Sequence, residues 1–299
     1  MQCAPICLFT YNRARHAQQT LIALQKNELA KESDLYIFSD GPKNQENEVQ
    51  VQEVRNLLEH IEGFKTVTVI HQEKNRGLAN SIIEGVSQIV NQFGKVIVME
   101  DDLVVSPYFL KYMNEALEMY AQDDCVASIH GYAYPIKEEM PTTYFMKGAD
   151  CWGWATWERA WKFFEKDGTK LLAMLQSKGL AYEFDFHGTQ PNIEMLKNQI
   201  VGKNNSWAIR WHASAFLQNM LTLYPGKSLV RNIGFDNSGE HCAVTSIFDV
   251  TPNDKPVALF RIPLEESKKA FKSYVKFFKN AREPIYRRIL RKAKALLSA

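Results

Sequence analysis

The sequence predicts an α/β fold with a mainly parallel sheet flanked by helices, and three observations indicate it. Short apolar or β-branched runs fit strands, at residues 5–11, 35–39, 66–71 and 95–99. Stretches with apolar residues at helical spacing separate these runs, at residues 14–26, 46–61 and 77–92. Polar or charged residues follow each strand. Strands and helices that alternate in this way form βαβ units, whose parallel sheets bind ligands at the carboxyl ends of the strands.

The pattern of elements divides the chain into three parts. It has 299 residues, of which 45% are hydrophobic and 23% are charged, as in ordinary globular proteins. The regular strand–helix pattern covers residues 1–105, and a less regular half that contains all six tryptophans covers residues 106–263. Because no linker separates these halves, we expect one continuous domain over residues 1–263, followed by a tail over residues 264–299.

The tail is basic, whereas the rest of the chain is acidic. From Ser267 onward there are 11 lysines and arginines against one acidic residue, a net charge of +10. Because the whole chain carries +2, the remainder carries −8. An acidic body does not suit a nucleic-acid partner, so none is expected.

Apolar residues at helical spacing run through the tail, and Pro284 is expected to divide it into two helices. A basic amphipathic helix is typical of binding to an anionic membrane surface, here through residues 267–299. The alternatives are a helix packed on the body with a solvated basic face, or a partly disordered tail.

The cysteines and the first residues predict a cytoplasmic protein. The five cysteines are scattered and form no Cys-x-x-Cys pair, which favours reduced thiols; those on the first strand are interpreted as core rather than zinc ligands. The chain begins with an apolar run at residues 4–10 that lacks the basic segment of a signal peptide. No apolar run approaches the roughly 20 residues of a membrane helix, so any membrane contact would be peripheral, on the inner face.

Three consecutive carboxylates, Glu100, Asp101 and Asp102, follow the buried strand at residues 95–99. Like charges so close together repel one another, and burial adds to the cost. A divalent cation would remove this cost, and oxygen ligands suit Mg²⁺ or Mn²⁺, which bridge diphosphates. The alternative is a solvated acidic turn in which Asp102 has a capping role.

Candidate ligand-binding residues also follow the other three strands. An arginine at a helix start can meet a phosphate, a carboxylate after a strand can accept a base N–H, and a glycine allows close backbone approach. Simple caps and turns are the alternatives for each segment. Because one sheet would bring all the segments to one edge, together they indicate a nucleotide-sugar site. The candidates are Thr10, Tyr11 and Arg13 after the first strand, Asp40 after the second, and Arg76, Gly77 and Asn80 after the third.

These segments resemble GT-A glycosyltransferases, the family 2 class and N-acetylglucosaminyltransferase I, over residues 4–250. The resemblance implies a GT-A (Rossmann-like) fold with a nucleotide-binding half and an acceptor-side half. It also implies transfer of a sugar from a nucleotide-diphosphate sugar, in particular a UDP-sugar, to a glycan or glycolipid acceptor. With the tail, it suggests synthesis of bacterial surface polysaccharide.

The same resemblance implies roles for individual residues. Asp102 would bind Mn²⁺ or Mg²⁺ directly, Asp101 would contact the ribose or the metal through water, and Glu100 would contact the donor sugar. Asp40 would bind the uracil ring. The loop from Asn75 to Asn80 would meet the diphosphate and the sugar.

Further matches lie in the second half. Residues 148–154 resemble the acceptor-side loop, in which Trp152 or Trp154 would stack on a sugar face, although a core role is the alternative. Residues 232–241 resemble the loop that closes over the donor. His241 would be a further metal ligand or touch the diphosphate, or else be structural.

One position departs from the family. The segment that matches residues 206–211 commonly carries an aspartate after its first tryptophan, and that aspartate is the general base of an inverting transfer. Here the position holds Ala208. Among the remaining candidates Asp150, Asp185 and Asp236, we favour Asp150, because it lies in the acceptor-side loop.

Two other functions stay open. A pseudoenzyme that binds sugar nucleotides or glycans would explain Ala208. A nucleotidyltransferase would need a glycine-rich loop after the first strand to hold a triphosphate, and residues 10–13 contain no glycine.

Overall fold

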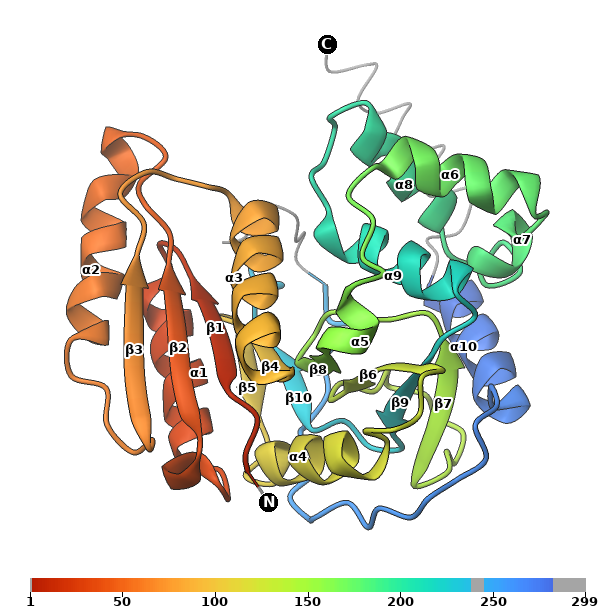
Figure 1. Cartoon of the computed structure of the whole chain (residues 1–299), viewed down its shortest axis with the longest axis horizontal. Coiled ribbons are helices and arrows are strands. Elements are labelled where there is room, and N and C mark those ends of the chain that lie inside the picture. Colours follow the sequence, from red (N-terminus) through yellow and green to blue (C-terminus); the bar gives the residue numbers. More distant parts are fainter. Residues whose placement is uncertain (1, 238–244, 282–299) are drawn as a thin grey trace.

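The structure is a computed structural model that describes residues 2–237 and 245–281. Within these residues eight strands form one sheet in the order β3-β2-β1-β4-β8-β6-β9-β7 (Figure 1). The parallel half confirms the predicted α/β fold, and its strands are β1 (Ile6–Thr10), β2 (Asp34–Ser39), β3 (Thr66–His71) and β4 (Lys95–Glu100). The other half is mixed and comprises β6 (Val126–His130), β7 (Thr143–Lys147), β8 (Trp154–Trp157) and β9 (Leu221–Pro225).

Successive side chains of the central strands enter two separate cores, because side chains alternate between the faces of a sheet. Ile6 and Leu8 of β1 pack in the core that contains α1 (Ala14–Gln25), α2 (Glu48–Leu58) and α4 (Phe109–Met119). Cys7 and Phe9 enter the opposite core with α3 (Leu78–Phe93). Cys7 is therefore a core residue, as its position on the strand indicated.

The second half adds short helices over the mixed end of the sheet. These are α5 (Glu158–Trp161), α6 (Gly168–Ser177), α7 (Ala181–Phe184), α8 (Asn192–Ile200) and α9 (Trp207–Leu217). The 3-10 helices η1 (Ala30–Glu32) and η2 (Gln45–Asn47) lie in loops of the first half. A small antiparallel pair, β5 (Leu103–Val105) with β10 (Val230–Asn232), joins the acidic segment after β4 to the chain beyond β9.

Helix α10 (Lys268–Ala281) lies alongside the edge strand β7 (Figure 1). Its apolar side chains Ala270, Tyr274 and Phe278 are buried against Tyr144 and Tyr224 of the sheet. For this part of the tail the expected lipid-facing apolar surface is wrong, because the aromatic edge of the sheet already covers it. The predicted break at Pro284 lies outside the described residues. No helix in the described part of the chain is long and apolar enough to cross a membrane.

Candidate active site

The acidic segment is paired with an arginine. Asp101 and Asp102 are buried in the turn after β4, and the Arg13 guanidinium at the start of α1 donates to both carboxylates, at 2.8 Å from Asp102 Oδ2. The Thr20 hydroxyl donates to the backbone carbonyl of Asp101 at 2.8 Å. The predicted strand ends of β1 and β4 therefore do meet, and Arg13 supplies a positive charge for two of the three carboxylates.

Burial changes the protonation of this segment. Burial raises the pKa of Glu100 to about 8, and the charges of Asp102 and Asp101 add to the rise. Burial also raises the pKa of Asp101, to about 6, against the opposing effect of Arg13. Although burial disfavours the charged guanidinium, both carboxylates raise the pKa of Arg13 above its ordinary value. Burial and the neighbouring carboxylates therefore favour the protonated form of Glu100, while Arg13 stays charged.

Asp40 organises the loop after β3. One carboxylate oxygen accepts the backbone N–H groups of Gly41 and Arg76, at 2.9 and 2.8 Å. The other accepts the Gly77 N–H at 2.9 Å and the Asn75 amide at 3.2 Å. Gly77 has a φ of 75°, in the left-handed region that favours glycine. Thus Asp40 joins the segments predicted after β2 and β3, through backbone contacts that the sequence did not indicate.

The remaining donor-side candidates lie in the segments that follow β1 and β3. The Tyr11 hydroxyl donates to Asn47 Oδ1 at 3.0 Å. The Arg76 guanidinium is exposed and pairs with Glu84 of α3 at 2.7 Å, while the Asn80 amide donates to the Arg76 carbonyl. Thr10 is buried at the end of β1, and its hydroxyl has no hydrogen-bond partner in the structure. These side chains lie at one sheet edge, as the strand pattern predicted.

A segment after β10 packs directly on the acidic turn. The Ile233 N–H donates to the Asp102 carbonyl at 2.8 Å. A Cβ on Gly234 would lie 2.2 Å from Asp102 Oδ2, so only glycine fits there without a shift. His16 Nε2 of α1 lies 3.1 Å from Asp236. The sequence placed Gly234 in the loop expected to close over the donor but did not indicate its close approach to Asp102, and it gave no signal for His16. His241, a predicted metal ligand, lies outside the described residues.

The acceptor-side loop holds Asp150 and Cys151 near the acidic segment. Burial raises the pKa of the Cys151 thiol well above its usual value, and the charges of Asp150, Glu100 and Asp102 raise it further. The Asp150 side chain is about one fifth exposed, at 21%. A partly accessible carboxylate here could receive a proton from a bound hydroxyl.

The tryptophans of this region divide into two groups. Trp152 is partly exposed and packs edge-on against Tyr132, Phe235 and Phe248. Trp154 is instead fully buried and stacks on Trp207 with ring centroids 5.5 Å apart, so its expected role in acceptor stacking is wrong. Trp154 is the first residue of β8, and its side chain points into the core that also contains Trp161, Trp207 and Trp211.

The alternative base candidates have structural partners. Asp185 accepts the backbone N–H of Ile193 at 2.7 Å, near the start of α8. Asp236 pairs with His16. Ala208, at the position of the family's aspartate, packs against the tryptophan-rich core. Asp150 is kept as the candidate because it lies in the acceptor-side loop beside Cys151, whose thiol feels the charges of Glu100 and Asp102.

The acidic segment suits a divalent cation by its chemistry, since carboxylate oxygens are the ligands that Mg²⁺ and Mn²⁺ prefer. Its present arrangement satisfies Asp101 and Asp102 with Arg13. Over residues 2–237 and 245–281 no group of three or more His, Cys, Asp or Glu side chains is arranged around a common metal position. A cation would therefore need Arg13 to release at least one carboxylate.

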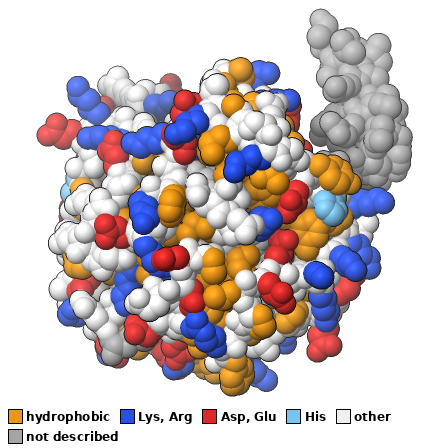
Figure 2. Space-filling model, turned by 45° about the vertical axis from the view of Figure 1, so that its right-hand side comes forward, with side chains coloured by type: hydrophobic (Ala, Val, Ile, Leu, Met, Phe, Trp, Pro, Cys, Tyr) orange, Lys and Arg blue, Asp and Glu red, His pale blue; other side chains and the backbone are white. Residues whose placement is uncertain are grey.

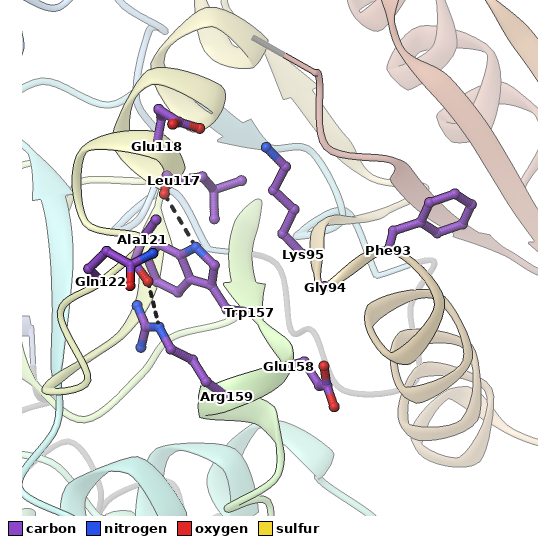
Figure 3. A pocket seen from close by; sticks show the side chains of 10 residues that line it. All are labelled: Phe93, Gly94, Lys95, Leu117, Glu118, Ala121, Gln122, Trp157, Glu158 and Arg159. Atoms are coloured by element: carbon purple, nitrogen blue, oxygen red, sulfur yellow. Dashed lines mark hydrogen bonds between the residues drawn. The ribbon is translucent and has the colours of Figure 1, made fainter.

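A cavity of about 360 Å³ lies away from these residues, at the other end of β4 (Figure 3). Lys95, Trp157 and Arg159 are among its lining residues. The Arg159 guanidinium donates to the carbonyls of Tyr120, Ala121 and Val126 and stacks over the Trp157 ring. Its charge is thus committed to holding the chain beyond α4, and the cavity belongs to the packing of this end of the sheet.

The family model described as glycosyl transferase family 2 matches residues 6–182, more than half of the chain. The chain belongs to glycosyl transferase family 2. The matched range includes the acidic segment, Arg13, Asp40 and Asp150, and it confirms the resemblance to that class. A search of curated proteins finds no match.

The chain is also similar to solved structures, at low sequence identity. The mannosyltransferase PcManGT from Pyrobaculum calidifontis, in complex with GDP-Man and Mn²⁺, is 12% identical with a TM-score of 0.31 and covers 46% of the chain. The chain spans only 37% of that protein. A UDP-glucose pyrophosphorylase complexed with UDP-glucose is 14% identical with a TM-score of 0.36. The likeness covers 74% of this chain and 90% of the pyrophosphorylase chain. TarS from S. aureus is 14% identical with a TM-score of 0.29. The likeness covers 49% of this chain and 25% of the TarS chain.

Proposed function

We propose that this glycosyltransferase moves a sugar from a nucleotide-diphosphate sugar, preferably a UDP-sugar, to a glycan or glycolipid acceptor with inversion. The role would lie in the synthesis of bacterial surface polysaccharide. The observation that carries the proposal is the Arg13–Asp101–Asp102 cluster at the carboxyl edge of the parallel strands. Parallel sheets of this kind bind ligands at that edge, and family membership makes sugar transfer the matching chemistry.

Three of the donor-side residues would have distinct roles. Arg13 and the N-terminus of α1 would bind the diphosphate, whose negative charge suits both. Asp40 would hold the Asn75–Gly77 loop in place for the nucleotide, and its carboxylate would bind the base edge only by giving up one backbone partner. Glu100 would contact a hydroxyl of the donor sugar.

A divalent cation, Mn²⁺ or Mg²⁺, would be held by Asp102 and the diphosphate. When bound, it would neutralise the diphosphate as that group leaves. Arg13 would then move its guanidinium from Asp102 toward a phosphate oxygen, which keeps every buried charge paired.

Asp150 would be the general base. It would take the proton of the acceptor hydroxyl as that oxygen forms its bond to the anomeric carbon, while the bond from that carbon to the diphosphate breaks. The nucleoside diphosphate would leave with the electron pair. This assignment replaces the aspartate that the family carries at the position of Ala208.

A thermal-shift screen tests donor binding. The protein is heated with UDP-glucose, UDP-N-acetylglucosamine or GDP-mannose, each with and without Mn²⁺. Saturation at about 100 times the dissociation constant should stabilise the folded chain by about 2.7 kcal/mol. A melting temperature that no nucleotide sugar raises would contradict the proposal.

The second candidate is a pseudoenzyme, which Ala208 favours. It would bind the same nucleotide sugars but release no nucleoside diphosphate, either to water or to an acceptor. Measuring release of UDP from the donor that binds best separates the two functions, because a transferase should hydrolyse its donor slowly even without an acceptor.

We further propose that the protein is cytoplasmic and that its basic tail binds anionic lipid at the inner face of the membrane. The apolar face of α10 is buried, so attraction through this helix would come from exposed lysines such as Lys269, Lys272 and Lys279, at about 1 kcal/mol each near the surface. Figure 2 shows basic and acidic side chains intermixed over the face that it displays. Co-sedimentation with phosphatidylglycerol vesicles at low salt tests this; protein left in the supernatant would contradict it.

A further inference from the structure

The carboxylate of Asp150 lies among hydroxyl groups rather than cations. Its Oδ1 accepts the Cys151 N–H at 2.8 Å. Its Oδ2 faces the hydroxyls of Tyr134 and Tyr224 at 3.3 and 3.5 Å, and His130 Nε2 at 3.7 Å. These distances are long for O–H···O bonds, as is common for catalytic groups before a substrate binds. Two phenols, one from the loop between β6 and β7 and one from β9, thus face one oxygen of this carboxylate.

Aromatic side chains of helix α10 pack against both of these tyrosines. The Tyr134 ring packs against Tyr274, Phe277 and Phe278 of α10, with ring centroids 5.1, 5.6 and 5.0 Å away. The Tyr224 ring also contacts Tyr274, at 6.0 Å. Both residues that donate to Asp150 from their side chains therefore touch the C-terminal helix.

A hydroxyl pair ties the same helix to the sheet. Tyr144 of β7 stacks on Tyr224 with the ring planes 6° apart, and its hydroxyl lies 2.9 Å from that of Tyr274. Burial of Tyr274, at 2% exposure, excludes water from this pair. The contact runs without interruption from α10 through Tyr144 and Tyr224 to Asp150.

We propose that Tyr134 is a positioning residue for Asp150, and that helix α10 holds Tyr134 in place. The proposal rests on the proposed function, in which Asp150 is the base, and it gives the C-terminal helix a part in catalysis rather than only in attachment. We therefore expect that disruption of α10 lowers transfer even to a soluble acceptor.

The surroundings determine the expected direction of the pH effect. A hydroxyl that donates to a carboxylate favours its charged form, so its removal raises the pKa of that carboxyl. Several other titratable groups whose pKa is shifted by the Asp150 charge come from different elements packed around it, and they are histidines, tyrosines and a cysteine. They are His130, Tyr132, Tyr144, Cys151, His212 and Tyr224.

The decisive variant is Tyr134→Phe in the full chain, which keeps the ring and removes the hydroxyl. Donor hydrolysis is followed against pH with whichever of UDP-glucose, UDP-N-acetylglucosamine and GDP-mannose the wild type cleaves. The acid limb of the kcat profile should move up by about one pH unit, with little change in KM for the donor. An acid limb that coincides with that of the wild type would overturn the proposal.

Tyr112→Phe is the matched control, because Tyr112 is fully buried in α4 and its hydroxyl has no partner in the structure. It should leave the acid limb unmoved. Phe278→Ala tests the helix: kcat per folded molecule should fall several-fold, and Phe278→Leu should restore most of it by refilling the space. A Phe278→Ala variant that loses stability but keeps its kcat would limit α10 to a structural role.

A second readout separates this proposal from the proposed function. The imidazole nitrogen shifts of His130 report on the nearby carboxylate and require no donor. They should change in Tyr134→Phe and not in Tyr112→Phe. If the wild type cleaves no donor, the proposed function fails, yet unchanged His130 shifts in Tyr134→Phe would separately refute the positioning role.

Discussion

The candidate site contains two groups of carboxylates that are held in opposite ways. Asp101 and Asp102 are buried against the guanidinium of Arg13, so one positive charge already offsets part of their negative charge. Asp150 is partly exposed and is held by hydroxyls and one backbone N–H. The first arrangement suits a permanent charge that organises a phosphate site. The second leaves a carboxylate able to accept a proton, so the two groups would suit two different functions.

The largest expected effect comes from Asp150→Asn, which removes the proposed base and keeps the shape. The amide cannot take a proton from the acceptor, so kcat should fall by about 10²–10⁴-fold, the usual contribution of a general base. Binding of UDP, measured by calorimetry, should stay as in the wild type. A variant with near-normal kcat would mean that Asp150 is not the base, and the proposed difference in function between the two carboxylate groups would fail.

Arg13→Met should next show how far the acidic segment depends on its cation. Removing one partner of a buried ion pair costs about 3 kcal/mol, because the other charge is left uncompensated. The melting temperature should fall, and Mn²⁺ should raise it more in the variant than in the wild type. Arg13→Lys is the control, since it keeps a positive charge. An Mn²⁺ effect no larger in Arg13→Met than in the wild type would mean that the carboxylates do not form a cation site.

Asp40→Ala should weaken nucleotide binding by roughly 1–3 kcal/mol, the usual loss when buried donors are left without their partner. The contacts of Asp40 indicate that this loss would come from a disordered Asn75–Gly77 loop as much as from a missing contact to the base. Asp40→Asn keeps part of the acceptor set and should lose less. Equal dissociation constants for UDP in the wild type, Asp40→Ala and Asp40→Asn would mean that Asp40 has no part in nucleotide binding.

The smallest effect concerns Glu100. Its pKa is raised to about 8 in the folded chain, so the folded state binds more protons than the unfolded state between about pH 4.5 and pH 8. The stability from this group is complete below that window and is lost as pH rises through it. Glu100→Gln imitates the protonated form, so its melting temperature should fall less between pH 6 and pH 8.5. Parallel curves for the two proteins would contradict the raised pKa.

The first half of the fold could be predicted from the sequence, and most of the second half could not. The strands β1 to β4 are short apolar runs between helices of regular period, so local pattern and tertiary role agree. The mixed strands β6 to β9 pair across long distances in the chain, as when β9 inserts between β6 and β7. Such pairings depend on contacts that no local pattern encodes.

The site divides in the same way. Residues that directly follow strands, such as Arg13, Asp40 and Asp102, could be placed at one edge because parallel strands end together. Trp154 could not be placed, since a tryptophan in a core and one on a sugar have the same local sequence. Likewise the packing of α10 on Tyr134 joins residues about 140 positions apart, and only the folded chain brings them together.

The most direct test of the central claim, that the acidic segment is the donor site, is a calorimetric titration of UDP with and without Mn²⁺ into the wild type and Asp102→Ala. Mn²⁺ should strengthen UDP binding to the wild type, and the variant should fold normally but lose this metal-dependent binding. A variant that binds UDP and Mn²⁺ as tightly as the wild type would contradict the assignment of Asp102, and with it the placement of the donor at this edge of the sheet.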